Sequence, residues 1–254
     1  MTHYAELESR DYDDCIDELD NINKDIVEEI FAKVKADGRD TLLGSEAYSV
    51  AEAYGISAAP IKLATSADEA SQLAADMEFP VVLKIASDKI LHKSDIGGVK
   101  VGIESEEEAK ATFDEIIANA KKAHPDIIPD GVEVQKMMES GQEVIVGMIK
   151  DKQFGPMVAF GMGGIYVNLI EDVSFKLANG MSSQEIDEQI NNTKVSELLK
   201  GYRGEAPCDI DEVKEAIKRV ARLTLDFPEI SELDINPIFV YENGSSALDI
   251  KIKL

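Results

Sequence analysis

The chain has 254 residues, 44% of them hydrophobic, which is enough to bury a core in one large domain or in two lobes. Its net charge of −24 argues against a basic surface for nucleic acid and against docking to anionic lipid, so we expect neither partner. No run approaches the roughly 20 apolar residues of a membrane helix, and the first residues are too acidic for a signal or transit peptide, so we expect a cytoplasmic protein.

The first 40 residues are strongly acidic, with 13 acidic and 5 basic residues and a net charge of −8. Within them, 22–34 has the spacing of an amphipathic helix, with Ile26, Ile30 and Val34 on one face. We interpret the rest of 1–40 as a solvated acidic extension without a catalytic role. The acidity of the whole chain is typical of a halophile, because salt screens the repulsion between like charges.

From residue 42 onward, helical and strand patterns alternate. The predicted helices are 45–54, 66–77 and 105–123, and the predicted strands are 80–85 and 98–103. Two of these helices begin with a capping box, because a glutamate follows Ser66 and Ser105 by three residues. The first helix ends before Gly55, a residue type that favours a left-handed C-cap.

A second set of elements follows residue 130. Its predicted strands are 131–137, 143–150 and 156–160, and its predicted helices are 182–191, 194–200 and 209–226. The chain closes with a hairpin of 235–241 and 247–252, in which Asn243-Gly244 favours a type I′ turn. Two prolines within 125–130 indicate a boundary. We therefore predict an α/β fold with one α+β lobe over 41–128 and a second over 129–254.

A lysine and a glycine pair indicate a site for phosphate. Lys84 ends a strand of otherwise apolar residues, and Gly97 and Gly98 end the polar loop that follows it. One cation and the backbone N–H groups that glycines leave accessible suit a polyphosphate. The Walker A pattern is absent, and an edge lysine whose head reaches solvent is the alternative interpretation of Lys84.

The same loop carries a histidine. His92 lies in LHKSDIGGV, a segment too polar to belong to a core. A neutral imidazole is a nucleophile toward phosphoryl groups, which makes His92 a candidate catalytic residue. The alternative is a surface histidine without function, and we keep that interpretation for His3 and His124, which have no such neighbours.

Three oxygen donors flank the closing hairpin. Asp234 and Asn236 alternate along one strand and so face the same way, and Asp249 can reach them from the partner strand. Hard oxygen ligands of this kind suit Mg²⁺, whose remaining positions are filled by phosphates and water. The alternative is an Asx turn before Pro237.

Three segments together resemble the ATP-grasp (beta) subunit of ADP-forming acetyl-CoA and acyl-CoA synthetases. They are PVVLKIASDKILHKSDIGGVKVGI, GVEVQKMMESGQEVIVGMIKDKQFGPMVAFGMGGIYV and ELDINPIFVYENGSSALDIKIKL. The likeness covers about residues 42–254, and HKSDIGGV and ELDINP are its most specific parts. It implies an ATP-grasp fold, in which two lobes clamp ATP or ADP with Mg²⁺, and with the acidity it favours a haloarchaeal source.

The resemblance also implies roles for individual residues. Lys84 matches the phosphate-binding lysine, and the three oxygen donors of the hairpin match the Mg²⁺ ligands. Gln135, Lys136, Met137 and Glu143 match the hinge and ribose region of the family. In that region, backbone groups at a strand end hydrogen-bond to the adenine edge, and a carboxylate hydrogen-bonds to the ribose hydroxyls. On their own, these four residues would be an ordinary amphipathic strand pair.

In that family, acyl-CoA and phosphate yield an acyl phosphate, which phosphorylates a histidine of the CoA-binding alpha subunit. The phosphoryl group then passes to ADP, and a second histidine, which His92 matches, takes part in the relay. The resemblance therefore implies a ligase that turns over only in a hetero-oligomer with that partner. A succinyl-CoA synthetase-like subunit is one alternative, although its loop lacks HKSD. A nucleotide-sensing protein without catalysis is the other.

Overall fold

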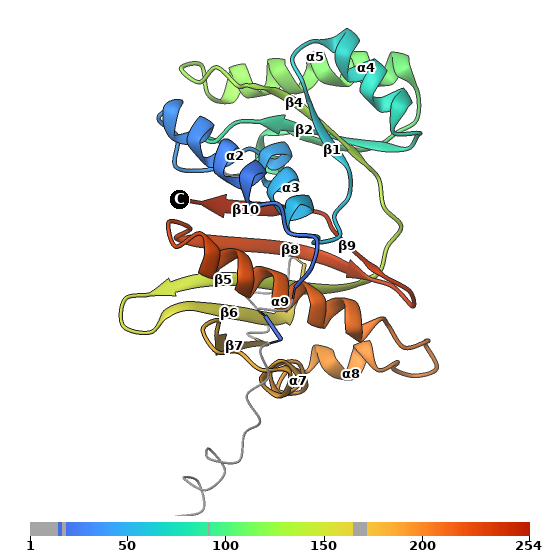
Figure 1. Cartoon of the computed structure of the whole chain (residues 1–254). Helices are drawn as coiled ribbons and strands as arrows, with labels where there is room; N and C mark the ends of the chain where they lie inside the picture. The colour runs from blue at the N-terminus through green and yellow to red at the C-terminus, as the bar shows by residue number, and fades with distance from the viewer. Residues whose placement is uncertain (1–14, 17–18, 91, 165–171) are drawn as a thin grey trace, which may run out of the picture.

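The computed structural model describes residues 15–16, 19–90, 92–164 and 172–254, so residues 1–14 and 17–18 of the predicted acidic extension lie outside the described residues. The described chain forms two lobes, each with its own sheet and its own hydrophobic core (Figure 1). No helix in these ranges is long and apolar enough to span a membrane.

The smaller lobe is a four-stranded antiparallel sheet covered by two helices. Its strand order is β1 (Ile61–Ala64), β4 (Gly131–Lys136), β2 (Val81–Ala86) and β3 (Val99–Ile103). The helices α4 (Ala67–Asp76) and α5 (Glu106–Ala123) lie on one side of it in Figure 1. The serine half of each predicted capping box is confirmed, because the side chains of Ser66 and Ser105 accept hydrogen bonds from Glu69 N and Glu108 N. The two glutamates accept from Thr65 N and Glu104 N, one residue before the N-cap, so the reciprocal half differs from the prediction. Strand β1 was not among the predicted elements.

The predicted boundary at 128/129 is wrong. Strand β4 lies between β1 and β2, so the smaller lobe ends with this strand at Lys136. The prolines Pro125 and Pro129 lie in the connection from α5 to β4, inside the lobe. A loop composition marks a break in regular structure, and strand pairing decides which sheet the next segment joins.

The larger lobe is a six-stranded antiparallel sheet with helices packed on one face. Its path is β10 (Ile250–Lys253), β8 (Glu232–Val240), β5 (Gln142–Asp151), β6 (Gly155–Met162) and β7 (Val173–Leu177), and β9 (Ser245–Ala247) pairs with β8. The helices that contribute buried residues to its core are α2 (Lys24–Ala36), α3 (Gly44–Ala53), α7 (Ser183–Asn191), α8 (Val195–Leu199) and α9 (Ile210–Asp226). Along β8, Leu233 and Ile235 point into this core, so Asp234 and Asn236 lie on the opposite face.

Helix α2 shows that two predictions are wrong. Residues 24–36 are packed in a core and are not part of a solvated extension over 1–40, and the smaller lobe does not start at residue 41. The buried residues of α2 are Val27, Phe31 and Val34, whereas Ile26, which we placed on the apolar face, is 40% exposed. Phe31 was missing from the predicted face, and its ring meets Phe227 edge-on with 5.3 Å between centroids. Helices α2 and α3 therefore belong to the core of the larger lobe.

The closing hairpin also differs from the prediction. Val240 pairs with Ser245, and Tyr241 N donates to Gly244 O (3.0 Å). Gly244 has φ +83°, but Asn243 does not take the positive φ that a type I′ turn needs at both central residues. The returning strand is interrupted between β9 and β10. The two residues at this break, Leu248 and Asp249, contact Lys84 of the smaller lobe.

Candidate functional site

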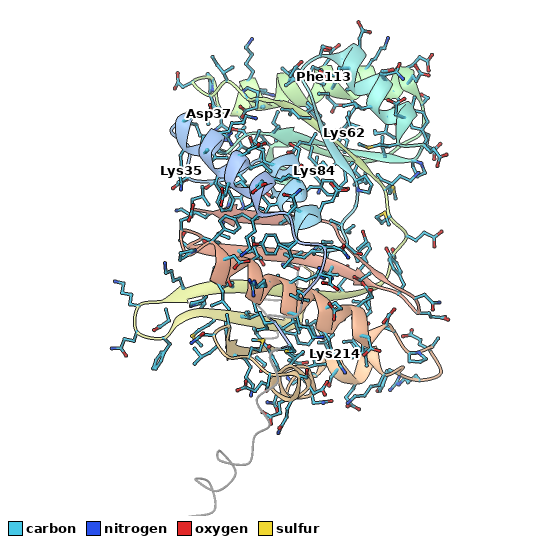
Figure 2. The ribbon with its side chains drawn as sticks, in the orientation of Figure 1. Lys35, Asp37, Lys62, Lys84, Phe113 and Lys214 are labelled. Carbon is cyan, nitrogen blue, oxygen red and sulfur yellow. The ribbon has the colours of Figure 1, made fainter. Side chains whose placement is uncertain are left out.

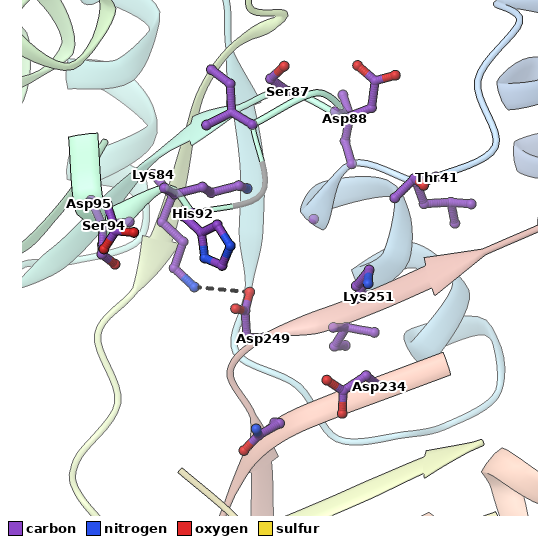
Figure 3. A pocket seen from close by; sticks show the side chains of 18 residues that line it. Thr41, Lys84, Ser87, Asp88, His92, Ser94, Asp95, Asp234, Asp249 and Lys251 are labelled. Carbon is purple, nitrogen blue, oxygen red and sulfur yellow. Dashed lines mark ion pairs between the residues drawn. The ribbon is translucent and has the colours of Figure 1, made fainter. Parts of the chain in front are cut away.

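A cavity of about 450 Å³ lies between the lobes and brings together the predicted histidine, the predicted phosphate lysine and the predicted metal ligands (Figure 3). The segment before α3, the loop after β2, and the strands β8 and β10 all contribute to its walls. Five predicted site residues line it, namely Lys84, His92, Asp234, Asn236 and Asp249. Residues far apart in sequence are thus brought to one space that both lobes enclose.

Lys84 projects from the smaller lobe toward the larger one. Its neighbours Leu83 and Ile85 are buried in the core, so the lysine side chain leaves the opposite face of the sheet, where Figure 2 shows it between the lobes. Its Nζ donates to Leu248 O (3.3 Å) and lies 3.6 Å from Asp249 Oδ1. The Asp249 side chain is 70% exposed. An ion pair this exposed is weak, so a phosphate anion can compete for the ammonium.

His92 stands at the start of the polar loop, before the short 3₁₀ helix η1 (Ser94–Ile96). Its side chain is exposed and directed into the cavity, beside Lys84 and above Asp249 in Figure 3. The backbone of the loop is held by Asp95 N, which donates to His92 O (3.2 Å). The arrangement presents an imidazole to the same space as the lysine and the carboxylates.

Gly97 and Gly98 do not form the predicted phosphate cradle in this structure. Gly97 N donates to Ser94 O (3.1 Å) and Gly98 N donates to Lys93 O (2.8 Å), so both N–H groups close the turn itself. Gly97 has φ +67°, and a Cβ on Gly98 would stand 2.8 Å from both Lys93 O and Ile85 Cγ2. The glycines let the loop fold tightly against β2.

The three predicted metal ligands surround the cavity without forming a complete cage. Asn236 N donates to Asp249 O (3.0 Å), which holds the strand break beside β8, and Asn236 Oδ1 accepts from Gly164 N (2.8 Å). Within the described ranges, no cluster of three or more His, Cys, Asp or Glu side chains could hold a metal alone. This is compatible with Mg²⁺, which completes its shell with phosphate oxygens and water.

Asp234 is a carboxylate whose surroundings favour a bound cation. Burial raises the pKa of Asp234, and the nearby carboxylates of Glu232 and Asp249 raise it further, against the opposing effect of Lys251. Lys251 therefore compensates the charge of an ionised Asp234 only in part. A bound cation would supply further positive charge, so the residues present fit a divalent metal.

The four residues of the predicted hinge and ribose region divide into two places. Gln135 Nε2 donates to Leu248 O (2.8 Å), the carbonyl that also accepts from Lys84, while Lys136 Nζ donates to Glu78 O (2.6 Å) and Met137 N to Pro80 O (3.2 Å). These three lie where the chain leaves β4 for the larger lobe. Glu143 lies elsewhere, beside Gly163 and Gly164 after β6, and its backbone carbonyl accepts a hydrogen bond from Gly163 N.

The sequence analysis did not single out two charged residues near the cavity, Glu133 and Lys93. Glu133 on β4 is 1% exposed, and its carboxylate accepts from Ser45 N (2.7 Å) and from Lys93 Nζ (3.4 Å). A signal was present, because a glutamate between Val132 and Val134 in a central strand needs a partner. The identity of that partner was not readable, since it is 40 residues away.

The ATP-grasp domain family matches residues 33–254. Two lobes, each with its own sheet, and a cavity between them that gathers a lysine and carboxylates define a protein of this class, and the predicted fold is confirmed.

Known proteins narrow the class further. The chain is 43% identical over 226 residues to the beta subunit of acetate–CoA ligase [ADP-forming] I of Pyrococcus furiosus, covering 89% of this chain and 97% of that one. It is 42% identical over 234 residues to acetate–CoA ligase [ADP-forming] I of Archaeoglobus fulgidus, covering 92% of this chain and 34% of that one. The chain thus spans about a third of the latter relative's length.

A solved structure agrees with these relatives. It is Ca. Korarchaeum cryptofilum acetyl-coenzyme A synthetase 1 with coenzyme A and Mg-AMPPCP, its phosphohistidine segment pointing towards the nucleotide-binding site. The TM-score is 0.79 at 40% identity, covering 89% of this chain and 99% of that one. The chain therefore belongs to the family of ADP-forming acetate–CoA ligase beta subunits, as the resemblance indicated.

Proposed function

We propose that this chain is the nucleotide-binding subunit of an ADP-forming acyl-CoA synthetase, which interconverts acyl-CoA, ADP and phosphate with acid, CoA and ATP. The observation that carries the proposal is the single cavity in which Lys84, His92, Asp234 and Asp249 meet from both lobes. Transfer of a phosphoryl group to ADP through a protein carrier uses these components, namely a cation for phosphate, oxygen ligands for Mg²⁺ and a nucleophile that carries the group.

The nucleotide would lie with its phosphates between Lys84 and the large-lobe carboxylates. Lys84 would bind phosphate oxygens in place of the exposed Asp249 carboxylate, 3.6 Å away. Asp234, Asn236 and Asp249 would hold Mg²⁺, which neutralises charge on the phosphates when bound. Because the pKa of Asp234 is raised by burial, positive charge beside it relieves a penalty that the nucleotide-free site carries.

His92 would carry the phosphoryl group between the subunits. A ring nitrogen of His92 attacks the phosphorus of the partner's phosphohistidine, a new P–N bond forms, and the old P–N bond breaks with its electron pair returning to the partner's ring. The terminal phosphate oxygen of ADP then attacks the same phosphorus, so a P–O bond forms, the P–N bond to His92 breaks and ATP results. The exposed position of His92 in the cavity supports both encounters.

The base and ribose would lie near the crossing between the lobes. The resemblance assigns this region to Gln135, Lys136, Met137 and Glu143, and the first three lie where the chain leaves the smaller lobe. Gly97 and Gly98 would shape the histidine loop rather than bind phosphate directly, since their N–H groups are already used.

The acyl group and CoA would be handled by a CoA-binding alpha subunit in a hetero-oligomer. The Pyrococcus relative is named a beta subunit, which implies an alpha partner, and the Archaeoglobus relative is about three times as long as the matched region. We place the complex in the cytoplasm and expect no nucleic-acid or membrane partner, given the charge of −24.

The family membership favours this proposal over a succinyl-CoA synthetase-like subunit, and a histidine directed into the cavity favours catalysis over nucleotide sensing. The test is reconstitution. The purified chain should bind Mg-ADP but form no ATP from acyl-CoA, ADP and phosphate, and adding the alpha subunit should start turnover. Steady turnover by the chain alone, or none with a CoA-binding partner that co-purifies with it, would contradict the proposal.

A further inference from the structure

Glu133 is a buried carboxylate that the proposed phosphoryl transfer does not use. It lies on β4, the strand between β1 and β2, and is 1% exposed. Its register partners are Leu63 on β1 and Lys84 on β2, so its side chain shares the face of Lys84, which is turned to the larger lobe. A carboxylate without partners would be costly in this position.

The two groups that satisfy Glu133 come from different parts of the fold. Ser45 N donates to it (2.7 Å) from the start of α3, a helix whose buried residues belong to the core of the larger lobe. Gly44 allows this approach, because a Cβ there would stand 2.8 Å from Glu133 Oε2. The second donor is Lys93 Nζ (3.4 Å), and Lys93 directly follows His92 in the loop. One carboxylate therefore joins the smaller lobe, the larger lobe and the histidine loop.

We infer that Glu133 is a positioning residue, which holds the His92 loop over the larger lobe through its ion pair with Lys93. The inference rests on the proposed role of His92 as phosphoryl carrier. The His92 ring is exposed, so its place in the cavity depends on how its loop is held. The Lys93 side chain is 26% exposed and the Glu133 side chain 1%, so water and salt screen this pair less than a surface pair.

The physical consequence concerns geometry and not nucleotide affinity. Without the charge of Glu133, the Lys93 ammonium is free to turn into solvent, and the neighbouring His92 samples more positions. Transfer through His92 requires its ring nitrogen in line with a phosphorus twice in each cycle, so a loosely held loop lowers the rate of transfer. Glu133 is not among the residues that line the cavity, and Lys93, which does line it, is held by Glu133 and not assigned to nucleotide, so we expect the KM for ADP to stay close to that of the wild type.

Two substitutions separate this role from a merely structural one. Glu133→Gln keeps an oxygen for the Ser45 N–H but removes the charge, and Lys93→Met keeps the length of the side chain but removes the ammonium. In the assembled complex, each should slow single-turnover transfer from the partner's phosphohistidine to ADP by about tenfold, with the KM for ADP within about twofold of wild type. Because both remove one interaction, the double variant should be no slower than the slower single variant.

Controls fix the interpretation. Lys93→Arg should retain most of the wild-type rate, and Lys100→Met, which breaks the exposed pair with Glu115 (2.7 Å) in the same lobe, should leave the rate unchanged. Wild-type transfer in both test variants, or losses that multiply in the double variant, would overturn the inference. If Glu133→Gln does not fold, Lys93→Met decides, because its side chain is partly exposed.

His92→Ala in the same assay keeps this inference distinct from the proposed function. If that variant transfers phosphate at the wild-type rate, the carrier role itself fails. If it abolishes transfer while the Glu133 and Lys93 variants transfer normally, only the positioning role fails.

Discussion

Lys84 and Asp249 belong to different lobes, yet their side chains meet across the cavity with 3.6 Å between Nζ and Oδ1. Gln135 and Lys84 also donate to the same carbonyl, Leu248 O, at the break between β9 and β10. This break between β9 and β10 is therefore one place at which the smaller lobe contacts the larger one through polar groups. We also propose that the nucleotide phosphates bind beside this break.

The first prediction concerns this pair. Lys84→Ala should weaken binding of Mg-ADP by about tenfold or more, because a hydrogen bond to a charged group is worth about 1.5–3 kcal/mol. Asp249→Asn should weaken the Mg²⁺-dependent part of the affinity by removing an anionic ligand. Titration calorimetry with and without Mg²⁺ separates the two effects. Wild-type affinity in both variants would place the nucleotide elsewhere.

Replacing Asp234 should change stability and nucleotide binding in opposite directions. Its pKa is raised by burial and by Glu232 and Asp249, so its contribution to stability is full below the ordinary aspartate pKa and is lost as the pH rises through the raised value. Asp234→Asn is neutral at every pH. It should raise the Tm of the metal-free chain at pH 7 and weaken Mg-ADP binding by about tenfold. Thermal melts and calorimetry on one preparation measure both, and a lower Tm would contradict the electrostatic argument.

The parts of the fold that follow from local rules were readable from the sequence. Helices α4 and α5 begin at Ser66 and Ser105 because those side chains cap them, and the alternation along β8 places Asp234 and Asn236 on one face. Lys84 was predicted at the end of an apolar strand, and the structure places it within β2, two residues before its end, with its side chain on the cavity wall.

What the sequence did not reveal depends on contacts between distant segments. The place of β4 in the smaller sheet is decided by its pairing with β1 and β2, and no local pattern encodes that choice. The Lys93–Glu133 pair joins residues 40 apart, and Leu248 contributes a backbone carbonyl, which any residue carries. The N–H groups of Gly97 and Gly98 were predicted to approach phosphate, but they bond to Ser94 O and Lys93 O, and hydrogen bonding inside a loop cannot be read from composition.

Helix α2 allows a test of core packing, because the sequence analysis placed Ile26 on its apolar face and omitted Phe31. Phe31→Ala should lower the free energy of unfolding by about 3–5 kcal/mol, because it removes a buried ring packed against Phe227 and leaves a cavity. Ile26→Ala on the same helix should change it by less than about 0.5 kcal/mol, since Ile26 is 40% exposed. Urea unfolding of the two variants provides the measurement. Equal losses would mean that α2 is not packed as described.

The net charge of −24 predicts that stability depends on salt. Raising ionic strength from 0.1 M to 1 M shortens the screening length from about 10 Å to about 3 Å, which relieves repulsion between acidic residues. The Tm should therefore rise across this range. Removing residues 1–14, which hold five acidic residues and one basic residue, should reduce the slope and leave Mg-ADP binding unchanged. This shorter deletion spares α2, which the core requires. Melting curves that are flat with salt would contradict the electrostatic interpretation.

His92 gives the sharpest test of the proposed function. His92→Ala should fold normally, because the side chain is exposed and the loop backbone is closed by hydrogen bonds from Asp95, Gly97 and Gly98 N–H groups. It should also bind Mg-ADP with wild-type affinity, since we assign phosphate to Lys84 and metal to the large-lobe oxygens. In the complex, acyl-CoA and labelled phosphate should still label the partner's histidine, but the label should not reach ADP.

The matched control for this experiment is His124→Ala. His124 follows α5 in the smaller lobe and is not among the residues that line the cavity, so its replacement should leave transfer intact. The decisive measurement is a single turnover in which label is followed on each subunit and in ATP. If His92→Ala forms ATP at the wild-type rate, the imidazole is a surface group, and the phosphoryl group passes from the partner directly to ADP. If label accumulates on the partner only in His92→Ala, the exposed His92 ring beside Lys84 is the carrier, because every other component of the cavity is unchanged.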